Sequence, residues 1–242
     1  MLRLAGRALQ AIYGLCALAV FCVLLLLAAL LALVVPRLAW RRGLTRGLAR
    51  LTLALFGLRV AIAGMERLPA GSCVVVANHS SYLDGVLLQA LLPPRFSFVV
   101  KHEASSLPVA GFLMQRIGVE FVDRHSQGGR QRGARRVIER ARRGHSLAFF
   151  PEGTFDDSVG LRRFHTGAFA AAVRGGMPVV PVAIRGARRA MPGHAIIPRR
   201  GSIEVEILEP LASTGPGVSA DSLRDEARRL MLARLDYPDC VA

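Results

Sequence analysis

The sequence predicts an α/β fold, a largely parallel sheet flanked by helices, with an N-terminal membrane-anchoring helix before it. From residue 58 onward, short β-branched runs alternate with segments whose apolar residues recur at helical spacing. This alternation is typical of a parallel sheet covered by helices. Residues 8–35 contain no charged side chain. We therefore expect a membrane anchor over residues 1–57 and one domain over residues 58–242, which is an ordinary domain size.

The uncharged stretch 8–35 predicts a membrane segment. As one helix it would be about 42 Å long, against a hydrocarbon core of about 30 Å. It either spans the bilayer with a tilt or forms a hairpin in one leaflet, and Gly14, its only internal helix breaker, slightly favours a single helix. Five arginines follow it closely and two precede it, a bias that keeps the following domain on the cytoplasmic face of the inner membrane.

Residues 40–56 predict an amphipathic helix. One face carries leucines and another face carries arginines; the two sets are Leu44, Leu48, Leu51 and Leu55, and Arg42, Arg46 and Arg50. With Trp40 at its start, we expect this helix to lie in the lipid interface, with its arginines attracted to anionic head groups. The alternative is a surface helix that packs its leucine face on the domain.

The domain itself divides into strands and helices. Strands are expected at 59–63, 73–77, 96–100, 119–122, 146–150 and 179–184, and helices at 83–92, 107–116, 130–143, 167–174 and 221–235. Residues 202–208 alternate between apolar and polar, which we interpret as an edge strand. Pro181 inside an apolar run likewise indicates an edge or a bulge, because proline cannot donate to a ladder.

Charge and cysteine usage narrow the classes of function. The net charge is +15, with a single lysine, Lys101, among 32 basic residues. This suits anionic partners such as a phospholipid surface, a phosphorylated cofactor, an acidic carrier protein or nucleic acid. Nucleic acid is disfavoured because the basic residues are not interleaved with aromatic ones and no binding module is recognisable. The four cysteines have no metal-ligand spacing, so no metal site is expected.

The seven residues from Asn78 to Asp84 carry the first chemical signal. His79 follows a buried strand, and ligands bind at the carboxyl ends of strands in open α/β sheets. Asp84, in the first helical turn, could orient one imidazole nitrogen and leave the other free to accept a proton from a hydroxyl. Alternatively, Asp84 only caps the helix as the third residue after Ser81.

Two further blocks follow predicted strands. Arg124 could bind a phosphate through two hydrogen bonds, or merely form a surface ion pair with Asp123. Glu152 could bind a hydroxyl or hold Arg124, Gly153 allows a close approach of backbone to ligand, and Thr154 can donate; an ordinary tight turn is the alternative. A serine hydrolase is disfavoured because the sequence has no Gly-x-Ser-x-Gly elbow.

Taken together, these blocks resemble the glycerolipid acyltransferases, especially those of the 1-acylglycerol-3-phosphate O-acyltransferase type. The matching runs are Asn-His-(four residues)-Asp at 78–84, Phe-Val-Asp-Arg at 121–124, Phe-Pro-Glu-Gly-Thr at 150–154 and Val-Pro-Val at 180–182. The resemblance covers about residues 60–211. It implies a membrane-bound α/β acyltransferase that moves an acyl chain from acyl-CoA or acyl-carrier protein to the free hydroxyl of 1-acylglycerol-3-phosphate, forming phosphatidic acid, without a bound cofactor.

The resemblance also implies roles for individual residues. His79 would act as the base and Asp84 as its orienting partner. Five residues would hold the acceptor: Arg124, Glu152, Gly153, Thr154 and, as a weaker candidate, Lys101. Two positions depart from the family, because Phe155 stands where Arg or Ser is frequent and His165 where Lys or Arg is usual. Both lie where a head group would bind, so a lyso-ornithine lipid or another lysophospholipid is an alternative acceptor, and a lipid-binding scaffold without activity is a further alternative.

Overall fold

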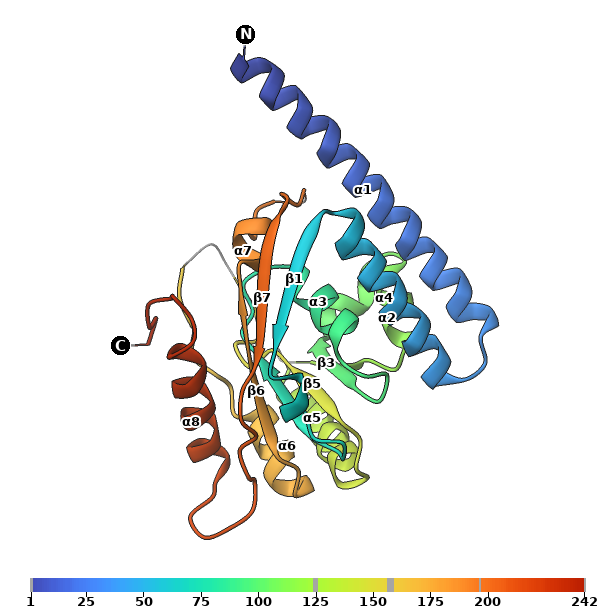
Figure 1. The fold of residues 1–242 in the computed structure, drawn as a ribbon. Coiled ribbons are helices and arrows are strands. Elements are labelled where there is room, and N and C mark those ends of the chain that lie inside the picture. Colours follow the sequence, from blue (N-terminus) through green and yellow to red (C-terminus); the bar gives the residue numbers. More distant parts are fainter. Residues whose placement is uncertain (1, 124–125, 156–158, 196, 242) are drawn as a thin grey trace.

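A seven-stranded sheet forms the centre of the computed structural model, which describes residues 2–123, 126–155, 159–195 and 197–241 (Figure 1). The strand order is β1-β7-β6-β2-β5-β3-β4. All neighbouring strands are parallel except β6 and β7, which confirms the expected α/β fold. The strands are β1 (Leu58–Ala63), β2 (Val74–Ala77), β3 (Ser97–Lys101), β4 (Glu120–Val122), β5 (Leu147–Phe149), β6 (Val179–Arg185) and β7 (Gly201–Ile207).

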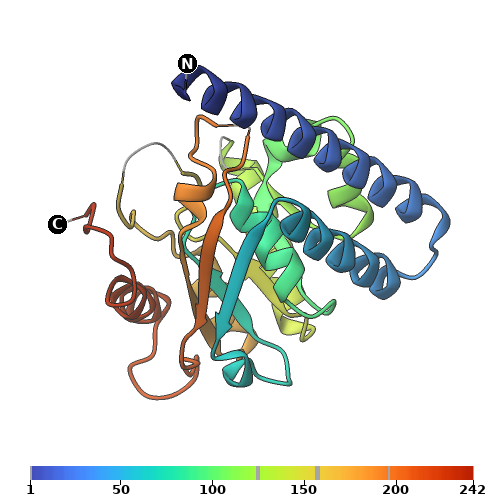
Figure 2. The ribbon, with the colours of Figure 1, turned by 45° about the horizontal axis from the view of Figure 1, so that its top comes forward.

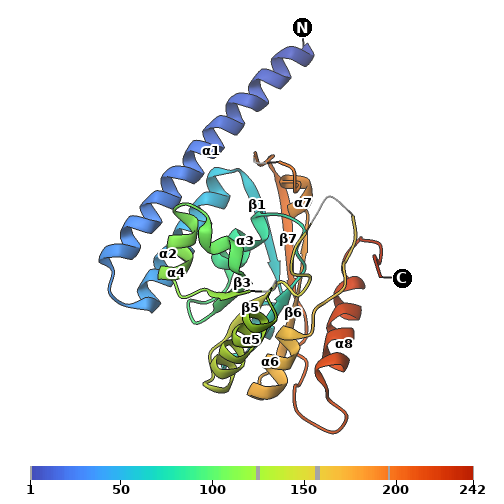
Figure 3. The same cartoon turned by 180° about the vertical axis from the view of Figure 1, so that it is seen from behind.

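The helices cover the two faces of this sheet (Figures 1 and 3). One layer holds α1 (Leu2–Val34), α2 (Leu38–Leu55), α3 (Leu83–Leu91) and α4 (Ala110–Arg116), and the other holds α5 (Gln127–Arg142), α6 (Gly167–Gly175) and α8 (Ala220–Leu232). The short α7 (Ala187–Ala190) packs on β7, and two 3-10 turns, η1 (Met65–Arg67) and η2 (His102–Ser106), follow β1 and β3.

Strand β2 separates two hydrophobic cores. Its side chains alternate between the faces, so Val75 and Ala77 pack in the core beneath α2 and α3, while Val74 and Val76 pack beneath α6. All four side chains have no exposed surface. Burial on both faces explains why this strand is continuously apolar, which is the pattern of a central parallel strand.

Helix α1 is one unbroken helix, as Gly14 suggested, and not a hairpin. Its inner side is built from buried alanines: Ala17, Ala28, Ala29 and Ala32. Leucines such as Leu15, Leu26 and Leu30 point outward and are more than half exposed. By length and composition, Leu9–Val34 is sufficient to cross a membrane. The first turns of α1 extend past the domain (Figure 1), and α2 runs beside α1 (Figure 2).

Helix α2 turns its arginines toward the domain, which corrects the expectation that they contact lipid head groups. Arg46 donates to Leu91 O at 2.8 Å and Arg50 donates to Ala90 O at 2.9 Å. These carbonyls lie in the last turn of α3, where a helix has no partners of its own for them. Arg42 is only 8% exposed. The leucine face points away from the domain and is largely exposed, so its place in the lipid interface remains a prediction.

Strand β7 is not an edge strand, because it lies between β1 and β6. Its alternation has another cause: Ile203 and Val205 face a core, whereas Glu204 faces outward and pairs with Arg185 at 2.9 Å. The expectation of an edge at Pro181 is also wrong, because β6 is an interior strand. Pro181 lies just before the first registered pair of the β6–β7 ladder, Val182 with Ile207, and its carbonyl accepts from Leu208 N at 2.9 Å.

Candidate active site

The predicted motif lies where the central strands β2 and β5 end. Because these strands are parallel, the residues that follow them meet at one edge of the sheet. Asn78, which is 2% exposed, fixes the chain as it leaves β2. Its side chain donates to Ile184 O at 2.9 Å and accepts from Ile184 N at 2.7 Å. The amide thus continues the pairing with β6 and presents His79 at the carboxyl edge.

His79 and Asp84 form a hydrogen-bonded pair. Nδ1 of His79 lies 3.0 Å from Oδ2 of Asp84, whose side chain is completely buried. The same oxygen accepts from the backbone N–H groups of Ser80 at 2.6 Å and Ser81 at 2.8 Å. Asp84 therefore bonds both to the imidazole and to the backbone that leads into α3, and its role as an orienting partner in catalysis stays a prediction.

Aromatic rings enclose the imidazole. Phe150 stacks on it with ring centroids 4.1 Å apart, and Phe155 meets it edge-on at 4.4 Å. Phe155 in turn contacts Tyr82, which is 63% exposed. Among the described residues, none hydrogen-bonds to the other ring nitrogen, Nε2. The histidine side chain is 18% exposed, and an imidazole nitrogen without a partner can accept a proton.

Glu152 points into the protein rather than toward an acceptor. Its side chain bridges two backbone N–H groups, that of His79 at 2.7 Å to Oε1 and that of Arg162 at 2.9 Å to Oε2. Burial raises the pKa of the carboxyl to about 7, and these two hydrogen bonds oppose the rise. The expected contact with Arg124 lies outside the described residues.

The other predicted residues gather at the same edge with less defined roles. Gly153 adopts φ +80°, and its N–H donates to Phe150 O at 3.0 Å, so the chain makes a tight turn here. Thr154 is exposed after this turn. Lys101 is the exposed last residue of β3, the parallel neighbour of β5. Arg124 lies outside the described residues.

Two features of the site were missed by sequence reasoning. Asn78 matched the motif, but its pairing with β6 is a long-range contact that gave no local signal. Arg162 contributes its backbone N–H, and a backbone donor is invisible in residue identity. Within the described part of the chain, no group of three His, Cys, Asp or Glu side chains is arranged to hold a metal ion.

Comparisons with known proteins agree with this geometry. A family model described as Acyltransferase matches residues 59–185. The lyso-ornithine lipid O-acyltransferase of Pseudomonas aeruginosa is 36% identical over 193 residues, covering 72% of each chain. A chloroplastic 1-acyl-sn-glycerol-3-phosphate acyltransferase of Brassica napus is 36% identical over 170 residues, 69% of this chain and 48% of that one, so the chain spans about half the length of the plant relative.

A solved structure shares the fold. The crystal structure of the 1-acyl-sn-glycerophosphate acyltransferase from Thermotoga maritima superposes with a TM-score of 0.80 at 21% identity, covering 94% of this chain and 95% of that one. The family model spans more than half of the chain, and the Pseudomonas relative matches across most of both sequences. The chain therefore belongs to the acyltransferase family, in its glycerolipid branch.

Proposed function

We propose that the chain is a membrane-bound O-acyltransferase that moves an acyl chain from a thioester donor to the free hydroxyl of 1-acylglycerol-3-phosphate, forming phosphatidic acid. The observation that carries this proposal is the 3.0 Å contact between His79 Nδ1 and the buried Asp84. This contact, at the carboxyl edge of the sheet, supports an imidazole that is held in place and acts as the base. The family membership and the named relatives support the same reaction.

The proposed mechanism is direct transfer. Asp84 accepts a hydrogen bond from the Nδ1–H group of His79, so Nε2 is the unprotonated nitrogen of the neutral imidazole. Nε2 takes the proton of the acceptor hydroxyl as its oxygen attacks the thioester carbonyl carbon. The carbon–sulfur bond then breaks, and the thiolate takes the proton from the imidazolium. A thiolate is a good leaving group, so a single base and correct positioning are sufficient.

The polar end of the acceptor is assigned to the rim around His79. We propose that Arg124, Gly153, Thr154 and Lys101 bind it, Arg124 through two hydrogen bonds to a phosphate. For Glu152 we propose a different role from direct binding. Both of its oxygens already accept from backbone N–H groups, so it holds the loop that carries His79.

The donor is proposed to be acyl-CoA or acyl-carrier protein, each a substrate and not a bound cofactor. Either one reaches the site from the aqueous side, whereas the lipid acceptor comes from the membrane. We place the protein at the inner membrane with its domain on the cytoplasmic face. The outward leucines of α1 and the arginines that follow it support this placement.

A lyso-ornithine lipid is the second candidate acceptor. The Pseudomonas enzyme that bears this activity in its name matches 72% of each chain. Phe155 also favours it, since an aromatic ring, and not a phosphate-binding cation, lies 4.4 Å from the imidazole at this position. An assay that offers both acceptors decides between the two substrates.

The test of function uses the full chain in phospholipid nanodiscs. Acyl-CoA and acyl-carrier protein are each supplied with 1-acylglycerol-3-phosphate or a lyso-ornithine lipid, and the products are identified by mass spectrometry. His79→Ala should lower turnover by at least about a hundredfold, the usual contribution of a general base. The matched control is His145→Ala, because His145 is exposed and precedes β5 at the opposite edge of the sheet. Near-normal turnover of His79→Ala would refute the proposal.

A further inference from the structure

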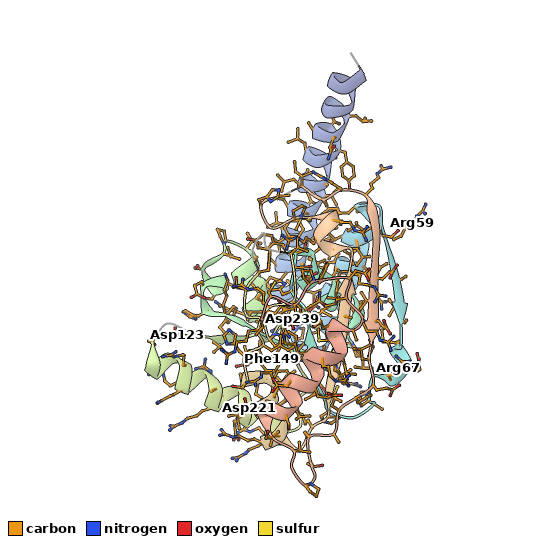
Figure 4. The ribbon with its side chains drawn as sticks, turned by 90° about the vertical axis from the view of Figure 1, so that its left-hand side faces the viewer. Arg59, Arg67, Asp123, Phe149, Asp221 and Asp239 are labelled. Carbon is orange, nitrogen blue, oxygen red and sulfur yellow. The ribbon has the colours of Figure 1, made fainter. Side chains whose placement is uncertain are left out.

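The C-terminal segment of the chain returns to the loop that precedes α6. After α8, residues 236–241 run beside residues 159–162, and Leu161 and Asp239 form a parallel bridge. Leu161 N donates to Pro238 O at 3.0 Å, and Cys240 N donates to Leu161 O at 3.3 Å. Figure 4 labels Asp221, in the first turn of α8, and Asp239, in the tail that follows this helix. The tail is thus bonded to the segment that contains Arg162.

Arg228 fastens this arrangement from within α8. Its guanidinium donates to Leu161 O at 2.7 Å and to Arg162 O at 3.1 Å. It also pairs through two nitrogens with the carboxylate of Asp239, at 2.9 Å for Nη1. The side chain is only 15% exposed. The planar guanidinium has five N–H donors and can bond to the two carbonyls and the carboxylate together. A lysine ammonium cannot do so in the same geometry.

A continuous path of hydrogen bonds joins Arg228 to the catalytic base. Arg228 holds the carbonyl of Arg162, and the N–H of Arg162 donates to Oε2 of Glu152 at 2.9 Å. Oε1 of the same carboxyl accepts from the N–H of His79 at 2.7 Å. Each bond restrains a backbone or a buried side chain, so the path is a physical route from α8 to the His79 backbone.

From this geometry we infer that Arg228 is a positioning residue: with Asp239 and the C-terminal tail it forms a clamp that fixes the His79 backbone through Arg162 and Glu152. The inference rests on the proposed function of His79 as the base. A clamp of this kind acts on turnover, because an ångström of displacement at the reacting atoms costs far more rate than affinity. A clamp that only docked α8 would change stability and leave the chemistry unchanged.

The experiment compares Arg228→Lys and Arg228→Gln with Arg229→Gln in the full chain in nanodiscs. Arg229 is the matched control because it lies on the same helix, pairs with Glu226 at the surface and is 67% exposed. We expect kcat to fall about tenfold in Arg228→Lys and further in Arg228→Gln, with KM for both substrates within about twofold. The control should keep both constants.

Hydrogen exchange supplies a readout that needs no activity. Amides of residues 78–84 should exchange faster in the Arg228 variants than in the wild type, and should not change in Arg229→Gln. If the Arg228 variants fail to fold, Asp239→Asn tests the same clamp with one partner weakened. In the double variant Arg228→Lys/Glu152→Gln, the loss should not exceed that of the worse single change, because both act along one path.

Four results would overturn the inference. They are an unchanged kcat in folded Arg228→Gln, a rise in KM with kcat preserved, exchange at residues 78–84 equal to that of the control, and additive losses in the double variant. A wild-type chain that transfers no acyl group would instead refute the proposed function. The exchange measurement would still decide whether the clamp restrains the loop.

Discussion

One carboxylate oxygen of Asp84 organises the reactive end of the sheet. It accepts from two backbone N–H groups and from the His79 ring. The backbone donors fix the carboxylate, and the fixed carboxylate fixes the ring. Asp84 is therefore held in place without any contact with solvent.

Asp84→Asn should lower kcat by about two to four orders of magnitude with little change in KM. The amide oxygen can still accept from the backbone, so the loop keeps its shape, but the neutral side chain no longer stabilises the imidazolium formed during transfer. Steady-state kinetics measure the effect, and circular dichroism checks the fold. If KM rose and kcat did not change, Asp84 would act only as a helix-capping residue.

Glu152 should give the stability of the protein a pH dependence. Its pKa rises from an ordinary 4.5 to about 7 in the fold, so the folded state binds this proton more tightly than the unfolded state. The resulting contribution to the free energy of unfolding is fully present below pH 4.5 and is lost as the pH rises through about 7. Glu152→Gln lacks this titration.

The measurement for Glu152 is chemical denaturation in mixed micelles at several values between pH 5 and 8. The free energy of unfolding of the wild type should fall relative to Glu152→Gln as the pH increases across this window. The difference should level off above pH 8, where the carboxyl is ionised in both states. Parallel curves for the two proteins would show that Glu152 keeps an ordinary pKa.

Sequence reasoning located the residues whose partners are near in the chain. His79 and Asp84 are five positions apart at a strand–helix junction, and their geometry follows from that spacing. The role of Glu152 could not be predicted, because its partners are two backbone N–H groups. That of His79 lies more than seventy residues earlier in the chain, and that of Arg162 lies ten residues later. Side-chain identity carries no record of such donors.

At the scale of elements, the orientation of α2 follows from hydrogen bonding more than from charge. Arg42 donates to Ile117 O at 2.8 Å, to Gly118 O at 3.3 Å and to the hydroxyl of Ser97. Burial lowers the pKa of Arg42, so its position next to these carbonyls carries a cost. The buried Ile117 carbonyl would otherwise lack this donor, which is also costly. The arginine links α2 to the loops around β3 and β4.

Arg42→Met should lower the free energy of unfolding by about 2–3 kcal/mol, because the buried Ile117 carbonyl and the buried Ser97 hydroxyl both lose their arginine donor. Arg50→Met is the matched control, since Arg50 makes one hydrogen bond from an exposed position, and its loss should be below about 1 kcal/mol. Thermal unfolding in detergent compares the two variants. If the unfolding temperature fell by the same amount in both variants, the Arg42 contacts would contribute little to stability.

Strand and helix locations were predictable because their periodicity is local. The order of the strands in the sheet was not predictable. The alternation of apolar and polar residues in β7 indicates only that one face of the strand is covered. Position within the order depends on which strands pair, and β7 pairs with both β1 and β6. The contacts of the α2 arginines were predicted wrongly for the same reason. A charged helix face has the same sequence pattern whether it contacts water, lipid head groups or buried carbonyls.

At the scale of the whole molecule, the structure separates an apolar side from a charged one. The outer face of α1 and the leucines of α2 lie on one layer, away from the sheet. The opposite layer includes α5, whose sequence carries six arginines and one glutamate. We therefore expect apolar burial, and not the arginines of α2, to attach the protein to membranes, which changes the expected response to salt.

The last prediction concerns this attachment. Wild-type chain mixed with anionic vesicles should float with them at low salt and at 1 M salt, because burial of apolar surface is not screened. Replacing Leu44, Leu51 and Leu55 by glutamate should lower transfer to vesicle-borne acceptors, since charges at these positions keep α2 out of the lipid. Transfer to a short-chain acceptor dispersed in detergent should persist.

The control for that experiment is the double change Arg46→Gln/Arg50→Gln. Both guanidinium groups bond to the end of α3 instead of facing outward, so their loss should leave flotation unchanged at either salt concentration. If the double change abolished flotation at low salt while the leucine variant floated normally, attachment would be electrostatic. The leucine face of α2 would then be an ordinary exposed surface, and the bilayer would have to meet the protein elsewhere.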